Sequence, residues 1–220
     1  GLLPLSSRDY MNAEMNKWGR LGVRGHAGTD RELDHPWSSY HEPINEQMAA
    51  LTGAKPEEVV VMNGLTVNLH LMMVTFYRPN EKRYKILIEG HAFPSDHFAV
   101  ESQIRHHGLS SEDALVIVNP RPGEELIRYE DIAALIEEHQ DELALVLLPG
   151  IQYYTGQVFP MADIVELGHQ AGAIVGFDLA HAVGNIPLEL HDWSADFAVW
   201  CNYKYVNGGP GAIAGCFVHE

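Results

Sequence analysis

The sequence is poor in several kinds of residue, and these shortages limit what the protein can be. Lys and Arg together number 14 against 30 Asp and Glu, which gives a formal net charge of −16. A negative field of this size disfavours nucleic acid and anionic membranes as main partners. No stretch reaches the roughly 20 apolar residues that a membrane-spanning helix needs, and no secretory signal pattern opens the chain. We therefore expect a globular protein located in the cytosol.

Cysteine is also scarce. The only two are Cys201 and Cys216, and both lie in apolar, strand-like segments. Free cysteine is among the most buried residue types, so both are predicted to be reduced core residues. Histidine is plentiful, with 13 copies, but none falls in a strong zinc-binding spacing, and no metal site is predicted.

The two ends of the sequence resemble cuts in a longer protein. The chain opens on Gly1 without a methionine and stops at Glu220 directly after an apolar run. Residues 1–41 contain many Gly, His and Trp and are predicted to form a loop-rich arm or active-site loops. Residues 42–220 are predicted to form one large domain.

From residue 42 onward, helix-like and strand-like segments alternate. Helices are expected over 42–53, 65–77, 94–108, 128–142 and 161–172. Strands are expected over 58–64, 83–90, 113–119, 143–150, 173–178, 196–203 and 212–219. Strands this uniformly apolar are covered on both faces, so the predicted fold class is α/β, a mainly parallel sheet sandwiched by helices.

Ligands of open α/β sheets bind beyond the carboxyl ends of the strands, so the polar residues that follow each strand are the candidates for a site. The first strand is followed by Leu65 and Thr66 at the start of a helix. Free N–H groups at a helix start, together with a threonine hydroxyl, form a small anion site. The alternative is a threonine that lies near a helix cap and binds nothing.

The turn after the strand at 83–90 carries Phe93, Pro94, Ser95 and Asp96. An aromatic ring beside polar side chains suits stacking on a planar ligand and hydrogen bonding to it. Ser95 or Asp96 could equally be an ordinary helix cap.

Two further strand ends carry ionisable residues. Asp178 closes an apolar run, His181 follows it in the segment GFDLAHAVG, and Lys204 follows the next strand. A buried carboxylate is costly without a cationic partner, and Lys204 is one such partner. A purely structural Asp–Lys pair or a helix cap would also explain Asp178.

Pyridoxal phosphate (PLP) is a cofactor that requires all of these features together. Its phosphate needs helix N–H groups and hydroxyls, its ring a stacking partner, its pyridine nitrogen a carboxylate, and its aldehyde a lysine. Lys204 lies between two tyrosines and just before a glycine cluster, which lets the backbone approach a ligand closely. We therefore interpret Lys204 as a Schiff-base lysine. The nearby run GPGAIAG leads into a strand rather than a helix, so it does not indicate a dinucleotide site.

Several long segments resemble kynureninase, a fold-type I PLP enzyme of the aminotransferase class V-like group. They are NGLTVNLHL, GHAFPSDHFAVESQI, YTGQ, GFDLAHAVGN and DFAVWCNYKYVNGGPGAIAG, and the resemblance runs in register from about Ala50 to Glu220. DLAH or the glycine-rich lysine loop alone would also fit other aminotransferase-like enzymes, including cysteine desulfurases. The combination with FPSD and LHDW favours kynureninase.

The resemblance implies a role for each matching residue. Lys204 would carry the cofactor, Asp178 would pair with its pyridinium nitrogen, His181 would belong to the same shell and Phe93, in the matched FPSD turn with Pro94 and Ser95, would stack on the ring. Leu65, through its backbone N–H, would hold the phosphate together with Thr66 and Tyr203, and Asp96 would lie near the 3-oxygen of the ring. Tyr203 would also relay a proton, and His26 would contact the substrate.

The implied activity is PLP-dependent hydrolysis of L-kynurenine, or of 3-hydroxy-L-kynurenine, to alanine and an anthranilate, by a homodimer. Two departures accompany the resemblance. Pro149 stands where a small hydroxyl residue is expected, and the C-terminal small domain of the family is absent from these residues. The alternatives are a related PLP enzyme of the cysteine desulfurase kind and a catalytically silent fragment that keeps the cofactor fold.

Overall fold

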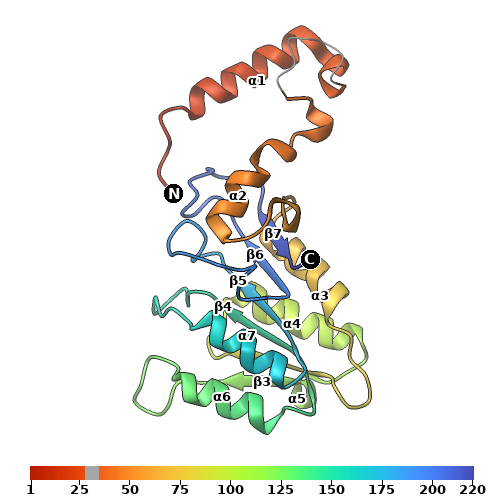
Figure 1. Cartoon of the computed structure of the whole chain (residues 1–220), viewed down its shortest axis with the longest axis vertical. Helices are drawn as coiled ribbons and strands as arrows, with labels where there is room; N and C mark the ends of the chain where they lie inside the picture. Colours follow the sequence, from red (N-terminus) through yellow and green to blue (C-terminus); the bar gives the residue numbers. More distant parts are fainter. Residues whose placement is uncertain (28–34) are drawn as a thin grey trace.

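The predicted alternation of strands and helices assembles into a seven-stranded sheet with helices on both faces (Figure 1). The computed structural model describes residues 1–27 and 35–220. The strands are β1 (Val59–Val61), β2 (Lys85–Glu89), β3 (Leu115–Val118), β4 (Leu143–Pro149), β5 (Ile174–Asp178), β6 (Phe197–Trp200) and β7 (Gly215–Val218). The α-helices are α1 (Ser7–Leu21), α2 (Asn45–Thr52), α3 (Leu65–Phe76), α4 (Pro94–His106), α5 (Ser111–Ala114), α6 (Tyr129–Glu138) and α7 (Met161–Gln170). Short 3₁₀ helices lie at Gly22–His26, Trp37–Ser39, Glu42–Ile44 and Pro56–Glu58.

The sheet is mainly parallel, which confirms the predicted fold class. Its strand order is β1-β7-β6-β5-β4-β2-β3. Strand β7 pairs antiparallel with both β1 and β6, and the remaining neighbours pair in parallel. Strand β2 lies between β3 and β4 in the sheet. The chain therefore adds β3 on one side of β2 and then continues with β4 on the other side. Such a switch point opens a crevice beyond the carboxyl ends of the strands.

The core has one layer on each face of the sheet, because successive side chains of a strand point to opposite faces. In β4, Val146 and Leu148 pack on the face that α2, α6 and α7 cover. Leu145 and Leu147 of the same strand pack on the face that α3 and α4 cover. Burial on both sides explains why the strands read as continuous apolar runs.

The prediction that residues 1–41 are loop-rich is wrong for Ser7–Leu21, which form α1. Tyr10, Met11, Met15 and Trp18 recur at helical spacing, a signal that the many Gly and Trp residues of this region obscured. Figure 1 shows α1 lying away from the sheet, and these four side chains are largely exposed. Residues 28–34 of the predicted arm lie outside the described residues. Neither α1 nor any other helix of the described ranges combines the length and apolar character that crossing a membrane requires.

The loop that carries Lys204 begins earlier than predicted, because β6 ends at Trp200 rather than at residue 203. Asn202 holds this loop in place. Its side-chain Nδ2 donates to the Ile213 carbonyl at 2.7 Å, and its Oδ1 accepts from the Trp200 indole at 3.0 Å. Its own carbonyl accepts from the Gly208 N–H at 2.8 Å. The loop is therefore fastened to the sheet two residues before Lys204.

Gly176 in β5 leaves room for the buried ring of Phe197 on β6, and an added Cβ would collide with that ring. We expect Gly176→Ala to lower the free energy of unfolding by about 1–3 kcal/mol, as overpacking of a core does. Urea unfolding measures the change. The control is Gly19→Ala in α1, where an added Cβ meets nothing within 4 Å. That substitution should be neutral or stabilising by up to about 1 kcal/mol. Equal unfolding midpoints for Gly176→Ala and wild type would contradict the packing described.

Candidate functional site

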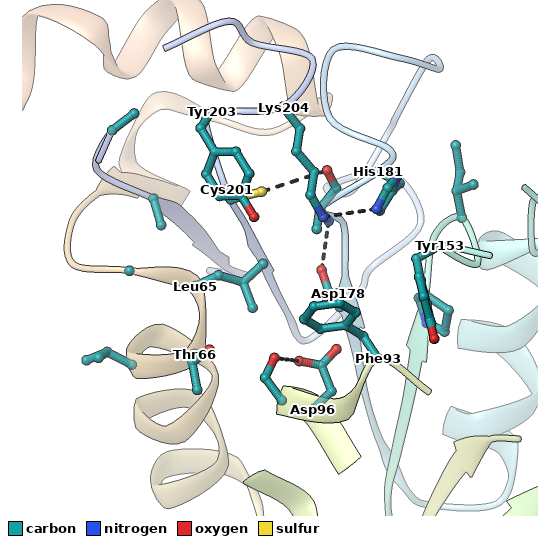
Figure 2. A pocket seen from close by; sticks show the side chains of 18 of the residues that line it. Leu65, Thr66, Phe93, Asp96, Tyr153, Asp178, His181, Cys201, Tyr203 and Lys204 are labelled. Atoms are coloured by element: carbon teal, nitrogen blue, oxygen red, sulfur yellow. Dashed lines mark hydrogen bonds between the residues drawn. The ribbon is translucent and has the colours of Figure 1, made fainter. Parts of the chain in front are cut away.

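A cavity of about 260 Å³ lies at the carboxyl ends of the strands (Figure 2). Its lining includes Leu65, Thr66, Glu89, Phe93, Ser95, Asp96, Pro149, Tyr153, Asp178, His181, Cys201, Tyr203 and Lys204. Every residue predicted to contact a cofactor lines this cavity except Pro94, which instead begins α4. Side chains from loops far apart in the sequence therefore converge where the sheet topology predicts a ligand.

One wall of the cavity is the N-terminus of α3. The helix begins at Leu65 after Gly64, and no side chain caps it. The sharp turn before it is made by Asn63, whose φ of 51° is left-handed and whose Nδ2 donates to the buried Asn68 at 3.0 Å. The first N–H groups of a helix have no intrahelical acceptor, so Leu65 and Thr66 bring unsatisfied donors and a hydroxyl to the cavity. This wall is suited to an anion.

The aromatic wall is built by Phe93, whose side chain remains 44% exposed. The Phe93 ring meets Tyr153 edge to face, with the ring centroids 5.2 Å apart, and the Lys204 Nζ lies 5.8 Å from its centroid. Phe93 is itself the N-cap residue of α4, and no side chain caps that helix. The alternative that Ser95 or Asp96 serves as a helix cap is therefore wrong. An exposed ring on a cavity wall can stack on a planar ligand.

The floor of the cavity is acidic. Asp178, the last residue of β5, is 9% exposed, and its Oδ1 accepts from the Ala180 N–H at 2.7 Å. Burial raises the pKa of Asp96 to about 10, and the charge of Asp178 adds to the effect. Burial also raises the pKa of Glu89 to about 7, again with a contribution from Asp178. Because carboxyl groups at such sites resist ionisation, this floor is suited to a ligand that brings a positive charge.

Lys204 reaches into the cavity from above the acidic floor, as Figure 2 shows. Its Nζ lies 2.9 Å from Nε2 of His181. Burial lowers the pKa of His181, the charge of Lys204 lowers it further, and Asp178 opposes the effect. His181 is therefore neutral at pH 7 and accepts a hydrogen bond from Lys204 at Nε2, which assigns its own proton to Nδ1. The lysine amine is thus oriented by an imidazole, whereas Asp178 is engaged by the backbone of Ala180.

Tyr203 and Cys201 complete the wall beside Lys204. Burial raises the pKa of both groups, and the nearby Cys201 raises that of the Tyr203 phenol further. Both side chains therefore keep their protons at neutral pH. Cys201 and Cys216 are buried and free, which confirms the prediction of reduced core cysteines. Nothing in the sequence pattern indicated that Cys201 also lines the cavity.

The structure does not bring His26 to this cavity. His26 lies at the end of a 3₁₀ helix in the arm, where its ring meets that of Trp37 edge to face at 5.3 Å. Both rings line a separate hollow beside α1. Pro149, at the end of β4, does line the cavity and pairs in register with Asp178, so it presents a ring without a hydroxyl there.

Glu89 is the main cavity residue that the sequence analysis did not select. It ends an apolar strand in the same way as Asp178, and that shared position is the signal that would have identified it. Tyr153 is a second such residue, because its contact with Phe93 depends on the spacing of β2 and β4 in the sheet.

A cluster of Glu58, His191 and His219 lies elsewhere in the described part of the chain, with one donor atom from each within 4.8 Å of the others. The Glu58 carboxylate accepts the N–H groups of Lys55 and Glu220 at 2.8 and 3.1 Å, and lies 2.9 Å from His191 Nδ1. Burial acts to raise the pKa of Glu58, but these hydrogen bonds produce a net lowering. The cluster therefore forms a hydrogen-bonded link between the start of β1 and the end of β7.

Comparison with known proteins identifies the family. The model of the family described as aminotransferase class-V matches residues 11–214. The chain belongs to this family. It is 57% identical over 220 residues to the kynureninase of Flavobacterium psychrophilum and 50% identical over 220 residues to that of Mus musculus. These matches cover 100% of the chain but 51% and 47% of the two relatives, so the chain spans about half the length of the curated relatives it matches.

Solved structures show the same fold. A mutant of C-DES with glycine covalently linked to its PLP cofactor superposes with a TM-score of 0.79 at 17% identity, over 100% of this chain and 54% of that one. The apo cysteine desulfurase of Thermococcus onnurineus gives 0.73 at 19% identity, over 100% and 52%. At these identities the likeness concerns the fold alone. The curated relatives, in contrast, confirm the resemblance to kynureninase that the sequence motifs indicated.

The pKa of Asp96 yields a test of the acidic floor. The pKa of Asp96 is raised in the folded protein. Its contribution to stability is therefore fully present below the ordinary aspartate pKa of about 4 and is lost as the pH rises toward the pKa of the folded state. Asp96→Asn keeps the shape of the neutral acid but cannot ionise. We expect the ligand-free variant to exceed wild type in free energy of unfolding by about 1 kcal/mol or more at pH 8, since one pKa unit corresponds to about 1.4 kcal/mol. At pH 4 the two should coincide.

Urea unfolding at the two pH values measures this difference. Asp131→Asn is the control of opposite sign, because hydrogen bonds from Arg121 lower the pKa of Asp131. That substitution should destabilise the protein at pH 8. Lower stability of Asp96→Asn at pH 8 would show that Asp96 is ionised and favourably paired in the folded protein.

Proposed function

We propose that the protein is a PLP-dependent hydrolase that cleaves the Cβ–Cγ bond of L-kynurenine, or of its 3-hydroxy derivative, to give alanine and an anthranilate. The observation that carries this proposal is the identity of 50–57% over the whole chain to proteins named kynureninase. The cavity supports it, because an anion-binding helix start, an aromatic wall, an acidic floor and a lysine surround one space.

The residues of the cavity fit PLP. When bound, this group supplies an electron-withdrawing ring that stabilises negative charge on an attached substrate carbon. In our proposal Lys204 would hold the cofactor covalently, Asp178 would pair with its ring nitrogen and Phe93 would stack on the ring. The N–H of Leu65 and the hydroxyl of Thr66 would hold the phosphate. A protonated ring nitrogen would supply the positive charge that the buried carboxyls of the floor lack.

The proton chemistry falls to Lys204, His181 and Tyr203. Besides holding the cofactor, Lys204 would act through its Nζ as the base that takes the proton from the substrate Cα. Neutral His181, 2.9 Å away, fixes the direction of this amine through its Nε2. The Tyr203 phenol keeps its proton at neutral pH and is the donor available to an oxygen of the phosphate or of the substrate ketone.

The assembly and location are parts of the same proposal. The exposed apolar side chains of α1 favour contact with a second copy of the chain, and we propose a homodimer in the cytosol. His26 on the same arm would then meet substrate from outside the cavity described here. Each cofactor-facing position carries a chemically competent side chain, which argues against a catalytically silent fragment.

The first test uses the full-length protein and follows anthranilate release from L-kynurenine by fluorescence. Lys204→Ala should lose the borohydride-trappable, covalently bound cofactor, and its turnover should fall by about 10²–10⁴-fold or more, because it removes both the attachment point and the base. Lys82→Ala, in an exposed loop, is the matched control and should behave as wild type. Release of sulfide and alanine from L-cysteine in the presence of a thiol reductant, without any anthranilate, would favour a desulfurase instead.

The second test concerns the phosphate. A hydrogen bond to a charged group contributes about 1.5–3 kcal/mol, so Thr66→Val should weaken PLP binding about tenfold or more. Binding of pyridoxal, which lacks the phosphate, should be unchanged. Thr75→Val is the control, because Thr75 lies in the same helix and its hydroxyl donates to the Leu71 carbonyl. Equal losses for PLP and pyridoxal would mean that Thr66 acts through the helix and not on the phosphate.

A further inference from the structure

Glu89 is a buried acid to which neither the resemblance nor the proposed chemistry gives a role. It is the last residue of β2, its side chain is 6% exposed, and it lines the same cavity as Lys204. Charged side chains are rarely buried to this extent unless a partner compensates them. Its position beneath the proposed cofactor site therefore calls for an explanation in terms of charge.

The topology of the sheet places Glu89 among acids from two other elements. Asp178 ends β5, Asp96 lies in the first turn of α4, and Glu89 ends β2. Strands β2 and β5 both pair with β4 in parallel, so their carboxyl ends meet at one edge of the sheet. Three carboxyl groups thus form the floor of a single cavity.

The three acids influence one another electrostatically. After burial, the next cause that raises the pKa of Glu89 is the charge of Asp178. The charges of Asp178 and Glu89 both raise the pKa of Asp96. With Asp96 kept neutral, Glu89 is the floor acid whose charge changes near pH 7. The other titratable groups that line the cavity are Tyr153, His181, Cys201, Tyr203 and Lys204.

We propose that Glu89 is a positioning residue that sets the negative charge beneath the cofactor's ring nitrogen, and that its ionisation strengthens cofactor binding. This inference rests on the proposed function. Ionised Glu89 attracts the protonated ring nitrogen directly, and it also helps to keep Asp96 in its neutral, hydrogen-bond-donating form. Protonated Glu89 does neither.

The sign of the pH dependence follows from linkage. A bound positive charge lowers the pKa of Glu89 below the value of about 7 that it has without ligand. Cofactor affinity must therefore rise with pH between the pKa of Glu89 in the cofactor-bound protein and its pKa in the free protein. The size of the rise depends on Glu89. The cofactor itself and the other groups that line the cavity are common to wild type and a variant that differs only at residue 89. The ratio of the two dissociation constants isolates the contribution of Glu89.

The experiment compares wild type with Glu89→Gln in the full-length protein, measuring the Kd of PLP by visible absorbance at pH 6 and pH 8.5. We expect the ratio of the variant Kd to the wild-type Kd to be near 1 at pH 6. At pH 8.5 it should rise to about 5–10, since tenfold corresponds to one pKa unit of interaction. Glu89→Asp, which keeps a carboxylate, should recover part of the rise. Glu101→Gln, at a half-buried position of α4 that does not line the cavity, should give a flat ratio near 1.

Three outcomes separate the alternatives. A ratio that is the same at both pH values would overturn the inference, because a purely structural Glu89 affects binding without regard to its charge, and the proposed function would stand. Absence of PLP binding by wild type would overturn the proposed function and the inference with it. If Glu89→Gln does not fold, the carbon-13 shift of the Glu89 carboxyl in wild type decides. Its titration midpoint must fall when PLP binds, and a midpoint that stays or rises refutes the inference.

Discussion

The constraint on which the rest of the site depends is the burial of acidic side chains at the carboxyl edge of a parallel sheet. Parallel pairing of β2, β4, β5 and β6 brings their ends to one place, and two of these strands end in a carboxylic acid. Burying ionised carboxylates without a partner is costly, so either the acids keep their protons or a cation must approach them. The raised pKa values of Glu89 and Asp96 show that burial favours the protonated form of both acids.

The remaining side chains of the cavity follow from this constraint. Lys204 lines the same cavity as the acidic floor, yet its Nζ is held by the neutral ring of His181 at 2.9 Å. A lysine that is oriented by an imidazole stays free to react, whereas one locked to a carboxylate would serve stability only. The fastening of the loop by Asn202, two residues earlier, fixes where this amine can reach.

Much of this arrangement is predictable from the sequence, because strand ends can be located from apolar runs and the topology of a parallel sheet brings them together. Thr66, Phe93, Asp178 and Lys204 were found in this way, each at a different strand end. Glu89 was missed because an acid at the end of a strand resembles the polar residue that commonly ends a strand, until its neighbours in the fold are known. Helix α1 was missed because the many Gly and Trp residues of its region obscured the helical spacing of its apolar side chains, which are largely exposed.

The two ends of the cavity differ in electrostatic character, and this difference limits what the cavity can hold. In Figure 2, Leu65 and Thr66 lie on one side at the start of α3, and Asp178 and Lys204 lie between them and Tyr153. The helix start offers partial positive charge and N–H donors, and the floor offers carboxyl groups. A ligand that is uniformly anionic would be repelled by the floor, and one that is uniformly cationic would leave the helix start unsatisfied. The cavity therefore selects a molecule that carries an anionic group at one end, a planar ring beside Phe93 and a basic nitrogen above Asp178.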